Sequence, residues 1–291
     1  MRLLVLGGTR NLGRHVVEAA LRSGHEVTLF NRGTTNPGLF PDVRRVIGDR
    51  ADPSALAAGE WDCVIDMSGL LVSDVRLSAE VLRDRAGHYV FMSTIGVYAD
   101  KATPGQDESG KLLPWPVDAP DNEFTMDLYG PAKVRCESLL AATFGSRTAA
   151  VRSGFVVGPY NPDFGNWGTA LASGGRMESA AGPSQPVQYV DARDLADFLL
   201  RCSELSGPFN VVGPTRTMGE LAAAWRSVVP DPAPMDWAPA VDRFHLNDEG
   251  LFRLDNSRAL AAGLRLRTDE EIARDYVAWI QAGNMPPDPP H

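Results

Sequence analysis

The sequence predicts an α/β protein built on a doubly wound parallel sheet, followed by a smaller carboxyl-terminal lobe. Apolar or β-branched runs alternate with helical periodicity from the first residues to about residue 157, as in parallel sheets covered by helices on both faces. The first run is followed at once by a glycine-rich turn and a helical segment. Beyond Gly158-Pro159 the alternation loosens and glycines and prolines accumulate, which indicates the second lobe.

The elements of the sheet domain follow from these runs in order. The first strand is an uninterrupted apolar run, which is typical of strands buried on both faces. Expected strands lie at residues 3–6, 26–30, 43–47, 62–66, 88–93 and 148–157. Expected helices run from Asn11 to Ser23-Gly24, from Asp52 over a short stretch, over 73–83 with Ser73 as a cap, and over 129–144. The proline-containing stretch 99–127 has little periodicity and is predicted to be a functional or mobile loop.

The second half of the chain resumes the pattern in part. Residues 187–190 and 209–212 have the character of returning sheet strands around a helix at 192–202, and helices are expected at 219–229 and 270–282. We therefore expect residues 1–159 to form the sheet domain, with further sheet elements from about 187–212. Residues 160–291 are expected to form mainly the smaller lobe.

The composition limits the classes of partner. The chain has 291 residues, 44% hydrophobic and 22% charged, which is typical of a soluble globular protein. Its net charge of −9 argues against nucleic-acid and anionic-membrane partners. No apolar run is long enough for a signal peptide or a membrane span, and the three cysteines are scattered, as expected for reduced thiols in a cytoplasmic protein. No Cys/His cluster has metal-ligand spacing, so no metal is expected.

Residues 3–13, LLVLGGTRNLG, have the pattern of a pyrophosphate cradle. The turn amides and the positive end of the following helix would face an anion together. Gly7 permits the tight turn, Gly8 lets the backbone approach the phosphates, and Gly13 lets the helix pack close to the strand. An ordinary strand–helix turn is the alternative. The expected cofactor contacts in this turn are Gly7, Thr9, Arg10, Asn11, Leu12 and Gly13.

Tyr129 and Lys133 are four residues apart on an expected helix and therefore share one face. A tyrosine with a pKa of about 10 is a poor acid–base catalyst, but a neighbouring ammonium favours the phenolate. Thr94 follows the strand at 88–93, where a hydroxyl can donate a hydrogen bond to a substrate carbonyl as negative charge develops on it. The alternatives are a solvated Tyr/Lys pair and a hydroxyl that only closes the strand.

The end of the strand at 26–30 indicates NADP in preference to NAD. A free ribose 2′-hydroxyl calls for an acidic residue there, whereas this chain has Asn31-Arg32, with Arg10 available in the glycine turn. Two guanidinium groups suit a 2′-phosphate, because arginine binds phosphate in a bidentate manner. A solvated loop position for Arg32 is the alternative.

Two further turns complete the predicted cofactor site. Asp49 is placed to accept a hydrogen bond from the adenine amino group, and Arg50 follows it. Ser68 and Gly69 follow Asp66 at the end of a strand, beside the expected nicotinamide path. A purely turn-forming role accounts for these residues about as well.

In order along the chain, the motifs resemble those of the extended short-chain dehydrogenase/reductases, the NAD-dependent epimerase/dehydratase family. The matching segments cover nearly the whole chain and are GGTRNLG, Gly48-Asp49, Ser93-Thr94 with Val97-Tyr98, Tyr129-Gly-Pro-Ala-Lys133, Arg152-Ser-Gly154, Gly158-Pro159, 190–196 and 209–214. Arg10 stands where the family has its middle glycine, as in the branch that includes chloroplast stem-loop RNA-binding relatives and many uncharacterised bacterial reductases. The chain is also shorter than typical sugar-nucleotide epimerases, which argues against a large nucleotide-sugar pocket.

The resemblance implies a Rossmann-type NAD(P)-binding domain over residues 1–159, a substrate-binding lobe over residues 160–291, and a homodimer. Tyr129 would be the general acid/base, Lys133 would hold the nicotinamide ribose, and Thr94 would polarise the substrate carbonyl. Ser93 would belong to the cofactor site, and Val156 would lie near the nicotinamide carboxamide.

Three hypotheses follow. The first is an NADP(H)-dependent reductase or dehydrogenase acting on a small carbonyl or hydroxyl substrate. The second is an epimerase or dehydratase that oxidises and re-reduces one substrate with retained NAD. The third is a non-catalytic nicotinamide sensor or an RNA-binding relative, which the net charge and the intact Tyr/Lys pair disfavour.

Overall fold

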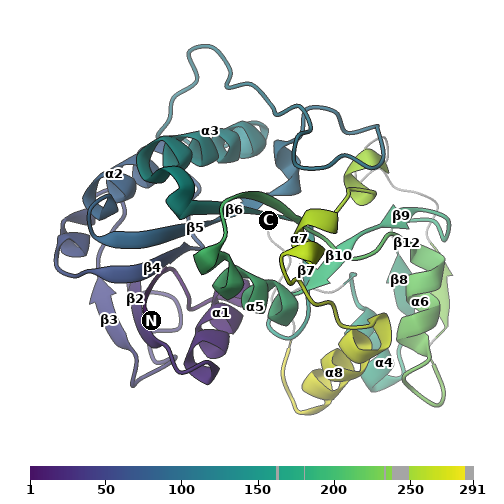
Figure 1. The fold of residues 1–291 in the computed structure, drawn as a ribbon. Helices are drawn as coiled ribbons and strands as arrows, with labels where there is room; N and C mark the ends of the chain where they lie inside the picture. Colours follow the sequence, from purple (N-terminus) through teal and green to yellow (C-terminus); the bar gives the residue numbers. More distant parts are fainter. Residues whose placement is uncertain (162–163, 180, 233, 238–248, 286–291) are drawn as a thin grey trace.

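The computed structural model describes residues 1–161, 164–179, 181–232, 234–237 and 249–285. Its centre is a seven-stranded parallel sheet, which confirms the predicted fold class (Figure 1). The strands are, in spatial order, β11 (Gly207–Val211), β6 (Thr148–Ser153), β5 (Ala86–Thr94), β4 (Trp61–Asp66), β1 (Arg2–Leu6), β2 (Glu26–Asn31) and β3 (Arg44–Ile47). The strand order changes direction between β1 and β4, so a ligand crevice is expected at their carboxyl ends.

Helices cover both faces of the sheet. On one face lie α1 (Asn11–Arg22) and α5 (Ala192–Arg201), and on the other lie α2 (Val72–Leu82) and α3 (Met126–Phe144) (Figure 1). In β1, Leu3 and Val5 pack into the core beneath the first pair of helices. Leu4 and Leu6 pack beneath the second pair, and all four side chains are fully buried. A strand covered on both faces has no solvent-facing position, which is why its apolar run is uninterrupted.

The second lobe is built around aromatic side chains. Its main helices are α4 (Trp167–Ser173), α6 (Met218–Arg226) and α8 (Asp269–Gln281). They contribute Trp167, Trp225 and Tyr276, whose fully buried rings contact one another. Short strands complete the lobe as two pairs, β12 (Arg216–Thr217) with β9 (Pro186–Val187) and β13 (Met235–Trp237) with β8 (Met177–Ser179). Helix α7 (Ser257–Ala261) packs instead on the sheet domain through Ala259.

Two expected sheet strands were wrong. Residues 148–157 do not form one strand, because β6 ends at Ser153 and the chain continues after Gly154 as β7 (Phe155–Val157). β7 pairs with β10 (Tyr189–Asp191) outside the main sheet, so the expected sheet strand at 187–190 is also absent from it. The change of direction occurs at Gly154, where a Cβ atom would lie only 3.1 Å from Val212 Cγ1. Of the elements expected around 187–212, only β11 joins the main sheet.

Two helix starts and the type of one helix also differ from expectation. Helix α2 begins at Val72, so Ser73 lies inside the helix and is not its cap. Helix α3 begins at Met126, three residues early, because the Thr125 hydroxyl caps it. The segment after Asp52 is a short 3₁₀ helix, Pro53–Ala57, and not an α-helix.

The stretch between β5 and α3 is a long loop, as expected, but it is tied to both parts of the molecule. Its Asp121 carboxylate pairs with Arg76 of α2. At its other end, the Gly105 N–H donates to the Arg253 carbonyl at 2.7 Å. The loop therefore runs over the carboxyl side of the sheet domain with fixed points at each end.

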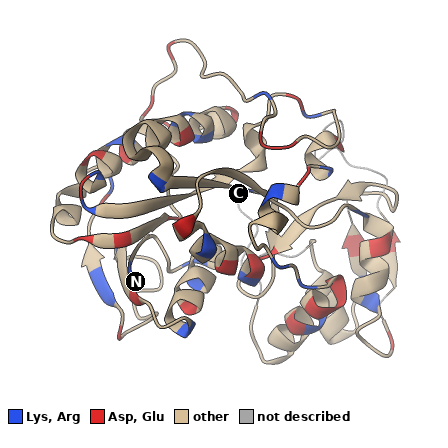
Figure 2. Ribbon diagram, viewed as in Figure 1, with Lys and Arg blue, Asp and Glu red and all other residues tan. Residues whose placement is uncertain are grey.

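Charged residues of both signs are distributed over the ribbon (Figure 2). Acidic residues are dense along α8, whose first turn holds Asp269, Glu270 and Glu271. Among the residues described, no helix combines the length and the apolar character that a membrane crossing requires.

Candidate active site

The glycine turn after β1 has no room for side chains. Gly7 and Gly8 have φ angles of +106° and +93°, which side chains rarely tolerate. A Cβ atom at Gly8 would lie 2.8 Å from Leu29 Cδ2, and one at Gly13 would lie 3.0 Å from the Gly8 Cα. Helix α1 therefore starts directly against the turn, and the side chain of its N-cap residue, Arg10, makes no capping bond. The amides of the first turn are thus open to an anion.

Hydrogen bonds fasten the loop after β2 to this turn. Asn31 Nδ2 donates to the Gly7 carbonyl at 3.3 Å, and the Asn31 Oδ1 accepts from the Gly33 N–H at 3.0 Å. Asn36 Nδ2 donates to the Thr9 carbonyl at 2.8 Å. Asn31 therefore has a structural role in addition to any contact with a cofactor.

Arg10 and Arg32 lie on the two segments that these bonds join. Both side chains are exposed, and within the described parts of the chain neither has a hydrogen-bond or ion-pair partner. The remaining turn residues differ, because Thr9 and Leu12 are buried and shape the turn from inside, while Asn11 is half-buried at a φ of +44°.

The turn after β4 lies against the glycine turn, since a Cβ atom at Gly7 would be 3.5 Å from Met67 Cβ. Asp66 in this turn is fully buried and accepts from Arg50 at 2.6 and 2.9 Å. The expected cofactor contact through Arg50 therefore needs correction: its guanidinium is committed to Asp66 and is buried with it. Ser68 is exposed at the same turn, and its Oγ accepts from Arg50 at 3.3 Å.

Thr94, Tyr129 and Lys133 come together at the carboxyl end of β5, as the sequence predicted. The hydroxyl groups of Thr94 and Tyr129 are hydrogen-bonded to each other, and Thr94 Oγ1 also accepts from the Gly96 N–H at 3.1 Å. The Lys133 ammonium lies 5.9 Å from the centroid of the Tyr129 ring. It donates to the carbonyls of Gly69 and Met92, at 2.8 Å each.

The titration behaviour of this set differs from the expectation. Burial raises the pKa of Tyr129 above its ordinary value, and the hydrogen bond with Thr94 opposes that rise. Burial also lowers the pKa of Lys133, to about 8, because the ammonium is taken out of water. Lys133 is not among the groups that shift the pKa of Tyr129, and two of its N–H groups donate to carbonyls instead.

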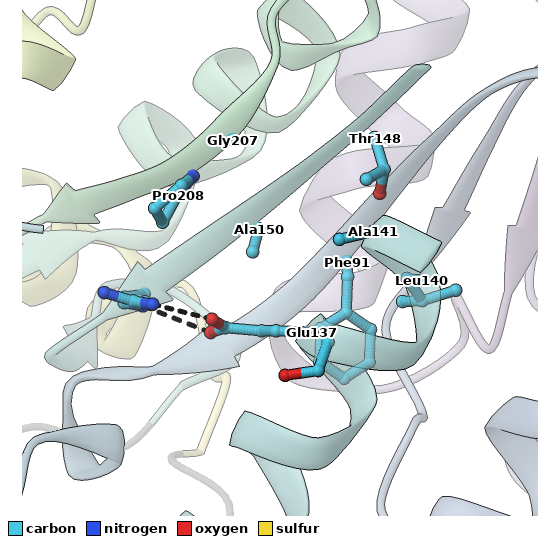
Figure 3. Close-up of a pocket in the computed structure, with 10 residues that line it drawn as sticks. Phe91, Glu137, Leu140, Ala141, Thr148, Ala150, Gly207 and Pro208 are labelled. Carbon is cyan, nitrogen blue, oxygen red and sulfur yellow. Dashed lines mark hydrogen bonds and ion pairs between the residues drawn. The ribbon is translucent and has the colours of Figure 1, made fainter. Parts of the chain in front are cut away.

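Ser93 does not face the crevice as expected. Its hydroxyl donates to Glu137 Oε1 at 2.5 Å, and Glu137 forms a buried ion pair with Arg152, at 2.7 Å between Oε2 and Nη2 (Figure 3). The pair lines a pocket of about 190 Å³ between α3 and the strands β6 and β11, which contains none of Thr94, Tyr129 and Lys133. Glu137 was not among the predicted site residues, although it lies four residues after Lys133 and so on the same helix face.

The two remaining predicted contacts are less constrained. Asp49 is exposed, and its carboxylate accepts from the Ala51 N–H at 3.0 Å, which is the turn-forming role. Val156 is half-buried on β7, beside Val190 of β10. The structure thus gathers the glycine turn, the Asp66–Gly69 turn and the Thr94, Tyr129 and Lys133 set at one edge, while the side chains of Arg50 and Ser93 point into the protein.

The chain is similar to known proteins in part of its sequence and in its fold. No family model matches the chain. It is 31% identical over 180 residues to the chloroplast stem-loop binding protein of 41 kDa b of Arabidopsis thaliana, a match covering 55% of this chain and 44% of that protein. It is 30% identical over 156 residues to the 2'-dehydrokanamycin reductase of Streptomyces kanamyceticus, covering 51% and 40%. The chain thus matches less than half the length of these curated relatives.

The fold is shared over the whole chain with solved structures. One example is the UDP-glucose-4-epimerase of Stenotrophomonas maltophila, solved with bound NAD and formylated UDP-arabinopyranose. The TM-score is 0.77 at 19% identity, and the match covers 97% of this chain and 98% of that one. Together, these matches show that the chain has the fold of solved UDP-sugar epimerases and is similar over about half its length to a reductase and a stem-loop binding protein.

Proposed function

We propose that this protein is an enzyme, an NADP(H)-dependent oxidoreductase that transfers a hydride between the nicotinamide and a small carbonyl or hydroxyl substrate. The observation that supports it most strongly is the meeting of Thr94, Tyr129 and Lys133 at the carboxyl end of β5. The partial similarity to a 2'-dehydrokanamycin reductase supports the reductive direction.

The residues present fit a nicotinamide dinucleotide. The close packing at Gly8 and Gly13 brings the backbone amides of α1 to the edge of the sheet, where a pyrophosphate would bind. Arg10 and Arg32, exposed and without partners among the described residues, would hold a 2′-phosphate. When bound, the reduced nicotinamide supplies the hydride.

The Thr94, Tyr129 and Lys133 set would then supply the proton to the substrate oxygen. The Tyr129 hydroxyl would give its proton to the substrate oxygen as the carbonyl carbon accepts the hydride, and the Thr94 hydroxyl would hold that oxygen by a hydrogen bond. Two of the three N–H groups of the Lys133 ammonium point at protein carbonyls, which leaves one for the nicotinamide ribose.

The test is the substitution Tyr129→Phe, which removes the hydroxyl and keeps the ring that packs against Phe124. We expect turnover to fall by about 10²–10⁴-fold while the NADPH dissociation constant stays within about twofold. NADPH oxidation is followed against ketones, with 2'-dehydrokanamycin as the first probe. Tyr189→Phe is the matched control, because it removes a phenol hydroxyl bonded to Asp269 in the second lobe. Unimpaired turnover in Tyr129→Phe would refute the assignment.

An epimerase with retained NAD is a second candidate, because solved epimerases share the fold over 97% of the chain. The same Thr94, Tyr129 and Lys133 set would serve that reaction. Protein purified with a stoichiometric, non-exchanging nicotinamide, and interconversion of UDP-glucose without net NAD turnover, would favour it. Weak, exchangeable NADPH binding supports the reductase.

RNA binding is a third candidate, because part of the chain is similar to the stem-loop binding protein of Arabidopsis thaliana. The net charge of −9 and the interspersed charges of Figure 2 disfavour it, because RNA binding draws on clustered basic residues. Salt-sensitive binding of a stem-loop RNA would support it. The homodimer implied by the family resemblance remains a prediction.

A further inference from the structure

The Asp66 carboxylate makes more bonds than a strand end requires. It accepts two from Arg50, one from the Tyr89 hydroxyl at 2.7 Å and one from the Ser68 N–H at 3.0 Å. Arg50 and Tyr89 are themselves buried. A buried ion pair is weak evidence for stability, because desolvation of the two charges offsets their attraction. The position of the Arg50–Asp66 ion pair in the candidate site therefore calls for another explanation.

The turn that Asp66 fixes carries one of the two carbonyls that hold Lys133. Gly69 accepts from the Lys133 ammonium at 2.8 Å, and the other acceptor is Met92 on β5. The turn is packed tightly, since a Cβ atom at Gly69 would lie 2.6 Å from Phe91 Cε2 and 3.1 Å from Asp66 Oδ2. Displacement of the carboxylate would therefore displace the Gly69 carbonyl as well.

We infer that Arg50 and Asp66 form a positioning pair for Lys133. Asp66 holds the turn after β4 so that the Gly69 and Met92 carbonyls aim the ammonium, and Arg50 holds Asp66. Neither residue needs to touch substrate or cofactor. This role rests on the proposed function, in which Lys133 binds the nicotinamide ribose.

The charged groups around Lys133 predict in which direction its pKa moves when Asp66 or Arg50 is replaced. The groups that act on it are Asp66 at the end of β4 and Arg50 in the loop after β3. From its own helix the groups are Cys136, Glu137 and Tyr129. Burial keeps the thiol of Cys136 neutral by raising its pKa to about 12, and Glu137 is paired with Arg152. Among these charges Asp66 favours the ammonium most strongly and Arg50 opposes it.

The three lysines of the chain make this measurable. Protein labelled with carbon-13 at the lysine ε position gives one NMR signal each for Lys101, Lys111 and Lys133, and Lys133→Met assigns the last. We expect Asp66→Asn to lower the measured pKa of Lys133 by about one unit or more, because the anion that favours the ammonium most strongly is lost. Arg50→Gln should move it upward. These opposite directions are not expected from general disruption of packing.

Asp66→Asn leaves Arg50 buried without its partner, so that variant can fail to fold. The double variant Arg50→Gln with Asp66→Asn leaves no unpaired charge, and its titration point should lie between those of the single variants. Asp62→Asn is the matched control, because Asp62 lies on the same strand but pairs at the surface with Arg2. It should leave Lys133 unchanged.

The positioning role would be overturned if the pKa of Lys133 moved in the same direction in both single variants. It would also be overturned if that pKa did not move in any of the three variants. NADPH titration of the same samples separates this outcome from failure of the proposed function. Wild-type protein that bound no nicotinamide dinucleotide would refute the function and leave the lysine titration intact. If both hold, the NADPH dissociation constant of Asp66→Asn should rise about tenfold, since a misdirected ammonium loses a charged hydrogen bond of about 1.5 kcal/mol.

Discussion

The preference for NADP over NAD can be tested at Arg10 and Arg32. Each is exposed, and among the described residues each lacks a partner that would compete for a phosphate. The bonds from Asn31 and Asn36 to the glycine turn hold their segments together in the free protein. Ordering the loop should therefore cost little when the cofactor binds.

The expected magnitude follows from the exposure of the two side chains. A charged contact at a solvated position contributes about 1 kcal/mol, which is a factor of about five in affinity. Arg10→Ala and Arg32→Ala should each weaken NADPH about fivefold, and the double variant about 30-fold if the two effects add. NADH lacks the 2′-phosphate, so its dissociation constant should change by less than about twofold.

The assay is a side-by-side fluorescence titration with NADPH and NADH, repeated at raised ionic strength. Salt should weaken NADPH binding in the wild type more than in the double variant, because fewer charged contacts remain to be screened. Arg22→Ala is the matched control, since this exposed arginine of α1 lies at the opposite end of the helix and pairs with Asp197. Equal losses for both nucleotides, or tighter NADH than NADPH binding by the wild type, would refute the reasoning.

Two further substitutions test the framework that carries the site. Gly8→Ala should cost about 2–4 kcal/mol of unfolding free energy, because it adds both a positive-φ penalty and a clash with Leu29. Gly24→Ala is the control for the positive-φ penalty alone, because Gly24 has a φ of +72° and a Cβ atom there would have nothing within 4 Å. Glu137→Gln should cost about 3 kcal/mol, since it leaves buried Arg152 without its partner; Glu204→Gln, in an exposed pair, should cost under about 1 kcal/mol. Chemical denaturation measures both, and equal losses in test and control would contradict them.

Local signals predicted most of the sheet domain. The apolar run of β1 and the glycines after it are dictated by burial on two faces and by close backbone packing, and both are visible in a single stretch of sequence. The division of residues 148–157 at Gly154 was not predictable in this way. It depends on β10, which lies over thirty residues further along the chain and draws β7 out of the main sheet.

The same distinction holds in the candidate site. Tyr129 and Lys133 share a helix, so their spacing alone predicted that they lie together. The partners of Arg50 and Ser93 come from other elements, Asp66 of β4 and Glu137 of α3, and no local pattern announces such pairs. Position along the chain therefore predicted cofactor contacts for both residues, whereas in the structure their polar atoms bind other side chains of the protein.

The protonation of Tyr129 links the structure to the direction of reaction. Burial raises the pKa of Tyr129, which favours the protonated phenol over the phenolate. A protonated phenol can donate to a carbonyl oxygen, as reduction requires, whereas oxidation of an alcohol needs a phenolate that accepts a proton. The Thr94 hydroxyl, already bonded to Tyr129, lies where it can hold the same substrate oxygen. Under the proposed function, the upward pKa shift favours the donor form of Tyr129 that carbonyl reduction uses, and an epimerase would need the bound dinucleotide to lower that pKa before its first, oxidative half-reaction.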